Sequence, residues 1–87
     1  MFIVAKHTIS DPAQFWGLAQ TAQLPAGVTL HTTFPNAGGT QAVCLWEADS
    51  VDTVRQLIDG LAGSISQNEF FEVDATNAVG LPTAASA

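Results

Sequence analysis

The sequence predicts a small α+β domain in which four strands and two helices follow one another in the order β-α-β-β-α-β. Three observations predict it: apolar strand-like runs, a turn-rich hairpin in the middle of the chain, and helical apolar stripes after the first and third strands. The chain of 87 residues has room for one modest core. We expect the domain to cover residues 1–76, with residues 77–87 as a C-terminal tail that partly docks on a neighbour or is disordered.

The first half of the domain contains a strand, a helix and a second strand. Phe2–Thr8 is apolar and β-branched, with polar residues at its far end, which is typical of a buried strand. Ser10 or Asp11 then caps a helix that ends before Leu24-Pro25, because the residue before a proline avoids the helical region. Gly27–Phe34 alternates between apolar and polar residues, as in a strand with one covered face.

The second half adds a strand, a helix and a last strand. A Pro-Asn-Ala-Gly-Gly turn leads into Gly39–Glu47, the longest strand-like run. Asp49 or Ser50 caps the second helix, whose apolar face continues over three turns, and Gln67–Asp74 is the final strand. Two right-handed crossovers then give an antiparallel sheet in the order 4-1-3-2, with both helices on one face.

The composition excludes several classes of partner. The chain has two permanent cations, Lys6 and Arg55, and a formal charge of −6. Nucleic acid and anionic membranes both require clustered Lys or Arg, which this chain lacks. One cysteine cannot form an internal disulfide, and no apolar run approaches the ~18 residues of a membrane span. We therefore expect a soluble, cytoplasmic protein without a leader peptide.

The balance of apolar and charged residues predicts a homo-oligomer. Apolar residues make up 47% of the chain and charged residues 11%, which is too few charges to cover the surface of a small monomer. An exposed apolar face of this kind marks an interface. The alternative is a monomer with a neutral surface rich in Ala, Thr and Gln.

Alternation along each strand assigns the side chains to the two faces of the sheet. The residues predicted to face the helices are Val28, Leu30, Phe34, Val43, Leu45, Phe71 and Val73. Those predicted on the open face are Ile3, Ala5, His7, Thr29, His31, Thr33, Ala42, Cys44, Trp46, Phe70 and Glu72. The open face then combines apolar groups with a few polar ones, which is the composition of a ligand pocket or a dimer-lined cavity. Its six candidate site residues are His7, His31, Cys44, Trp46, Phe70 and Glu72.

Two segments carry a resemblance to a known superfamily. Cys44-Leu45-Trp46-Glu47-Ala48 before a capped helix, with Asn68-Glu69-Phe70-Phe71-Glu72-Val73 after it, resembles small bacterial families of the dimeric α/β-barrel superfamily, including one with nickel-binding members. The resemblance covers the order of elements from Phe2 to Asp74. It implies a ferredoxin-like fold, two protomers packed sheet to sheet, and a cavity between the sheets or between sheet and helices.

The two histidines are the candidate catalytic residues, because their ordinary pKa lies near neutrality. His7 or His31 would act as a general base in the cavity or as a metal ligand. Alternatively, each is a strand histidine hydrogen-bonded at the rim of the sheet, since no fixed-spacing motif links them.

Cys44 could act as a nucleophile or a soft metal ligand in its thiolate form, and hairpin pairing predicts that it lies near His31. Together with His7 and Glu72, these residues have the chemistry of a divalent transition-metal site. The HxH, CxxC and HExxH spacings are absent from the sequence, however. A buried, inert strand cysteine is the alternative.

These patterns lead us to expect a homodimer that binds a small ligand or a metal ion in a cavity on the open sheet face. Trp46 and Phe70 would stack on a flat ligand, or else pack at the contact between sheets. A second hypothesis is a cofactor-free oxygenase or isomerase acting on an apolar cyclic substrate, as occurs in the same superfamily. A third is a structural dimerisation module whose open face is fully used in packing.

Overall fold

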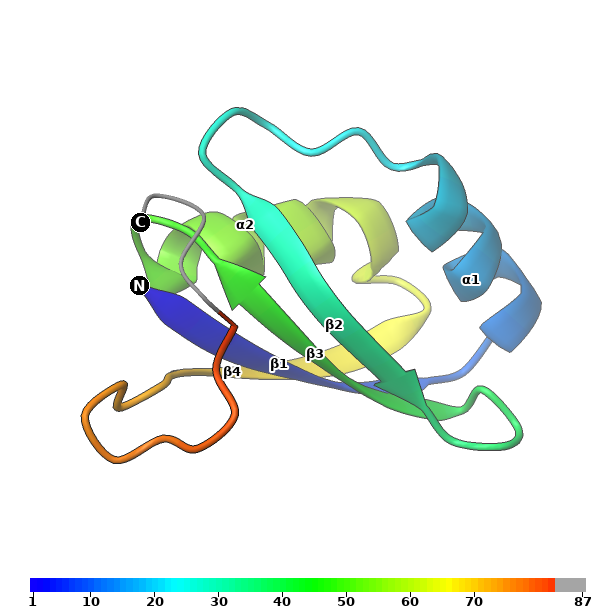
Figure 1. The fold of residues 1–87 in the computed structure, drawn as a ribbon. Coiled ribbons are helices and arrows are strands. Elements are labelled where there is room, and N and C mark those ends of the chain that lie inside the picture. Colours follow the sequence, from blue (N-terminus) through cyan, green and yellow to red (C-terminus); the bar gives the residue numbers. More distant parts are fainter. Residues whose placement is uncertain (83–87) are drawn as a thin grey trace.

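The protein is a two-layer α+β domain in which two helices cover one face of a four-stranded antiparallel sheet (Figure 1). The computed structural model describes residues 1–82, and residues 83–87 of the predicted tail lie outside this range. The elements are β1 (Phe2–Ile9), α1 (Pro12–Thr21), β2 (Thr29–Pro35), β3 (Gln41–Glu47), α2 (Val51–Ala62) and β4 (Ser66–Glu72). The predicted β-α-β-β-α-β order is confirmed, and the fold is consistent with a ferredoxin-like domain.

Strands β1 and β3 form the centre of the sheet, whose strand order is β2-β3-β1-β4. β1 runs antiparallel to β3, from Phe2 opposite Glu47 to Thr8 opposite Gln41, and antiparallel to β4 on its other side. This is the predicted 4-1-3-2 order. Residues directly opposite each other on neighbouring strands share a face, so the register decides which side of the sheet each side chain occupies.

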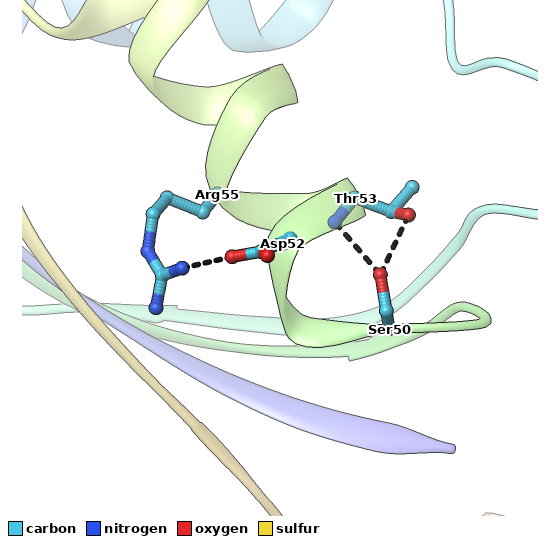
Figure 2. A network of polar contacts seen from close by, with 4 residues as sticks. All are labelled: Ser50, Asp52, Thr53 and Arg55. Atoms are coloured by element: carbon cyan, nitrogen blue, oxygen red, sulfur yellow. Dashed lines mark hydrogen bonds and ion pairs between the residues drawn. The ribbon is translucent and has the colours of Figure 1, made fainter.

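Each helix begins at a capping side chain. The carboxylate of Asp11 accepts a hydrogen bond from the backbone N–H three residues on, and Ser50 Oγ accepts one from the N–H of Thr53 at 3.1 Å (Figure 2). One of the two predicted caps is therefore used at each helix. Asp52 and Arg55 form an exposed ion pair in the first turns of α2 (Figure 2), a contact that contributes little to stability. Within residues 1–82, no helix is long and apolar enough to cross a membrane.

The core lies between the sheet and the helices and consists of two clusters. The larger one joins the sheet to α2, and its buried members are Ile3, Ala5, Val28, Cys44, Trp46, Ala48, Val54 and Ile58. The smaller one joins the sheet to both helices, and its buried members are Ile9, Phe15, Ala42 and Ala62. Trp16 also anchors α1, because its Nε1 donates to the Gly39 carbonyl at 3.0 Å. Gly39 has a φ of 71°, and a Cβ there would lie 3.0 Å from the same nitrogen, so this contact requires glycine.

The predicted faces of the two central strands are wrong. The six residues expected on the open face are Ile3, Ala5, His7, Ala42, Cys44 and Trp46; all lie beneath the helices, and none is more than 4% exposed. Val43 and Leu45, expected beneath the helices, instead face the open side, where Val43 is 41% exposed. The reason is that residues 42–46 are all apolar, so the sequence pattern does not indicate which alternate side chains the helices cover.

A bulge in β2 reverses the alternation of that strand. Leu30 and Thr32 pair with adjacent residues of β3, so His31 is an extra residue between them. Beyond the bulge, Thr33 joins the helix-covered face and Phe34 joins the open face, the reverse of the predicted assignment. Phe34 is consequently 68% exposed.

The predicted faces of β4 are also reversed. Phe70 lies opposite the buried Ala5 and packs against the core, and Glu72 lies opposite Ile3. Phe71 points to the open side and is 51% exposed. Two consecutive phenylalanines fit either assignment, so only the register with β1 distinguishes them.

The open face of the sheet is partly overlain by the segment that follows β4 (orange to red in Figure 1). Val4, Val43 and Leu45 line a groove of about 400 Å³ on the sheet side. Residues 78–82 and Val73, which was predicted beneath the helices, line its other side. The two faces of the sheet therefore have different surroundings: helices on one side, and a short segment beside exposed apolar side chains on the other.

Candidate functional site

A cavity of about 130 Å³ lies between the sheet and the two helices. Its apolar walls are Phe15, Trp16, Ala19, Ala22, Leu24, Leu30, Ile58 and Leu61. The sheet contributes His7, Thr33, Cys44 and Trp46. Leu24, Leu30 and Leu61 are each 38–40% exposed, which places the mouth of the cavity beside the edge strand β2.

His7 is a buried polar residue on the helix-covered face of β1, and it is 3% exposed. Its Nδ1 lies 2.6 Å from Oδ1 of Asn68, the residue opposite it on β4. Its ring packs against Phe15, with ring centroids 5.3 Å apart. Burial lowers the pKa of His7 below its ordinary value, and the hydrogen bond to Asn68 opposes this effect more weakly. The imidazole is therefore neutral at pH 7.

A second hydrogen bond fixes which nitrogen of His7 carries the proton. Asn68 Nδ2 donates to Asp59 Oδ1 on α2 at 3.3 Å, which turns the amide oxygen of Asn68 toward His7. An amide oxygen can only accept, so His7 Nδ1 must be the donor. Nε2 then carries the lone pair, and it makes no hydrogen bond to any residue within 1–82. This nitrogen can accept a hydrogen bond or a proton from a bound molecule.

Trp46 offers a hydrogen-bond donor, whereas His7 Nε2 offers an acceptor. Its side chain lies on the covered face of β3, is 4% exposed and borders the same cavity. Its Nε1–H is buried and has no hydrogen-bond partner in the described part of the chain. A buried donor left unpaired costs about 1–3 kcal/mol, so such groups are rare in folded proteins. An acceptor on a bound molecule would remove this cost.

Cys44 is held as a neutral thiol. Burial raises the pKa of its thiol, and the neighbouring Thr33 side chain opposes the shift to a smaller extent. Nucleophilic attack and metal binding both require the thiolate, which this environment disfavours. Cys44 therefore contributes shape and apolar surface to the cavity.

His31 lies on the other side of the sheet. Its Nε2 is 2.9 Å from Oε1 of Glu47, and its ring lies 5.6 Å from that of Phe2, both residues of the open face. The sheet thus separates His31 from His7 and Cys44. The predicted proximity of His31 and Cys44 is wrong, because the hairpin register places Thr33 opposite Cys44 and His31 lies in the bulge, on the open face.

The residues predicted to bind a metal ion do not converge. His7 and Cys44 lie beneath the helices, His31 lies on the open face, and Glu72 is an exposed residue at the end of β4. A transition-metal site needs three or four ligands around one point. In the part of the chain that the structure describes, no three His, Cys, Asp or Glu side chains are grouped to hold a metal ion.

The cavity thus contains half of the predicted site residues: His7, Cys44 and Trp46 line it. Phe70 lies outside it and packs beneath Arg55, whose guanidinium is 5.7 Å from the ring centre. Asn68 was not among the predicted site residues, because a side-chain amide is neither an acid, a base nor a nucleophile. The signal that could have identified it is its position in β4, two residues before Phe70 and so on the same face.

Comparisons of the chain with protein-family models, with curated proteins and with solved structures find no match. The resemblance to the dimeric α/β-barrel superfamily therefore stays a prediction. The function has to be inferred from the geometry of the site.

Acidification should weaken folding through His7. Its pKa is below the ordinary 6.5 in the folded protein, so the unfolded chain takes up the proton first as the pH falls. The free energy of unfolding should therefore fall as the pH drops below about 7, by at most about 1.4 kcal/mol per pH unit for one proton. Urea denaturation at several pH values measures this slope.

The two histidines provide a matched pair of variants for this experiment. His7→Gln should flatten the pH dependence, whereas His31→Gln should retain it. Equal slopes for the wild type and His7→Gln would contradict a buried, neutral His7.

Proposed function

We propose that this protein binds a small, largely apolar molecule in the cavity between its helices and its sheet. The observation that carries the proposal is the unpaired, buried Trp46 Nε1–H beside a largely apolar cavity. Small-molecule sites typically combine apolar walls with a few polar groups that orient the ligand. The lining contains no Asp, Glu, Lys or Arg, so a neutral ligand suits it.

The size of the cavity limits the ligand to about one ring. An engineered apolar cavity of about 150 Å³ in another protein binds benzene, and this cavity has a volume of about 130 Å³. Its mouth beside Leu24, Leu30 and Leu61 gives access from solvent. A ligand of about six to eight non-hydrogen atoms therefore fits.

Benzene, as a minimal probe, should raise the melting temperature of the protein in a concentration-dependent way, because a ligand that binds the folded state stabilises it. Ala19→Leu adds three carbon atoms at the cavity wall and should abolish this rise. Ala13→Leu, an exposed position of the same helix outside the cavity lining, should leave the rise unchanged. Differential scanning fluorimetry measures all three, and a wild type without a rise, or an equal rise in Ala19→Leu, would overturn the proposal.

A second candidate function uses the same cavity: a cofactor-free oxygenase or isomerase acting on an apolar cyclic substrate. The observation that favours it is the chain of hydrogen bonds from Asp59 through Asn68 to His7, since a general base needs an orienting partner. His7 Nε2 would take a proton from the substrate. This role requires a neutral His7 at pH 7, so the pH experiment above would exclude it if His7 were protonated.

We further propose that two copies of the chain associate through the open faces of their sheets. The proposal is supported by Phe34, Val43 and Phe71, which are 68%, 41% and 51% exposed on one face. On this face Val4 lies between Leu45 and Phe71 across the sheet, and Phe34 lies opposite Val43. Exposed apolar groups of this kind mark an interaction site. A structural dimerisation module, the third predicted function, would use this surface alone and leave the cavity without a role.

Light scattering tests the dimer directly. The wild type should have twice the 9.1 kDa mass of the chain, and Val43→Asp should be monomeric, because it places a charge beside the exposed Phe34 in the proposed interface. Ala13→Asp, on the exposed side of α1, should remain dimeric. A monomeric wild type would contradict this assembly but leave the cavity unaffected.

A further inference from the structure

We infer that the ligand of the cavity is a neutral phenol-class compound: one aromatic ring whose hydroxyl donates to His7 Nε2 and which carries an oxygen that accepts from Trp46 Nε1–H. This inference rests on the proposed function and specifies the chemical class of the ligand.

The inference is based on the polar groups in the cavity lining that lack a hydrogen-bond partner. His7 offers an acceptor, since its Nδ1–H is committed to Asn68, and Trp46 offers a donor with no partner in residues 1–82. Thr33 and Cys44 lie opposite each other on β2 and β3, and their side chains can satisfy one another. A ligand therefore meets one free acceptor and one free donor, and it needs both an O–H and an oxygen lone pair to pair with them.

The two free groups approach the cavity from different ends. His7 lies opposite Ala42 and Trp46 lies opposite Ile3, so the two residues are on neighbouring strands and are four positions apart, about 13 Å in the strand direction. Their side chains span part of that distance, and a ring occupies the rest. A ring with oxygen at opposite ends therefore matches the site better than a ring with one oxygen.

The walls favour an aromatic ring over a saturated one. Phe15 and Trp16 pack edge to face, with centroids 5.0 Å apart, and both line the cavity with Trp46. Aromatic rings in such surroundings gain from offset-stacked and edge-to-face contacts. A phenol is also neutral at pH 7, since its ordinary pKa is about 10, so it brings no unpaired charge into the cavity.

The test compares the affinities of benzene, phenol and 1,4-benzenediol, measured by NMR titration of the intact protein. Phenol should bind about tenfold more tightly than benzene, which is the gain expected from one additional hydrogen bond. The diol, kept reduced, should bind more tightly again.

Two variants assign these gains to the two side chains. His7→Leu should bind phenol no more tightly than benzene. Trp46→Phe keeps an aromatic ring but removes the N–H, and it should remove the advantage of the diol over phenol. If one variant fails to fold, the other still tests its own side chain. The wild-type affinities for the three probes test the inference even if neither variant folds.

The outcomes separate this inference from the proposed function. If all three probes bind with equal affinity, the cavity is a ligand site but the phenol class is wrong. If phenol is favoured equally in the wild type and in both variants, His7 and Trp46 are not the anchors and the inference also fails. If none of the probes binds, the proposed function itself is wrong.

Discussion

The hydrogen bond between His7 and Asn68 is the interaction on which the rest of the site depends. It joins β1 to β4 on the face beneath the helices, and Asp59 of α2 orients the amide that accepts it. Three elements from separate parts of the chain must therefore be in place before His7 Nε2 is left free. Without this bond, Nδ1 of an imidazole that is 3% exposed would lose its hydrogen-bond partner.

The sheet separates two surfaces of different composition. Beneath the helices the central strands present three small side chains, Ala5, Ala42 and Cys44, between larger ones such as His7 and Trp46. A floor of small side chains allows a space to remain between the sheet and the helices. The opposite face presents larger exposed groups such as Phe34. Ligand binding and dimer formation would thus involve different side chains, and each can be disrupted without the other.

The order of elements could be predicted from the sequence because its signals are local. A capping residue such as Ser50 and a turn such as the one at Gly39 act through their own neighbours along the chain. The choice of face is not local. Val43 and Cys44 are both apolar, so only the packing of the helices decides between them, and the bulge at His31 has no sequence signature. His7, Cys44 and Trp46 were correctly grouped on one face, but the predicted face was the wrong one.

Intermolecular NOEs between phenol and the side chains of the protein test most directly whether the ligand site lies beneath the helices. If it does, phenol protons should show NOEs to Phe15, Leu30 and the Trp46 indole, all of which line the cavity. NOEs to Val43 and Phe71 would place the ligand on the open face and contradict the site described for this protein.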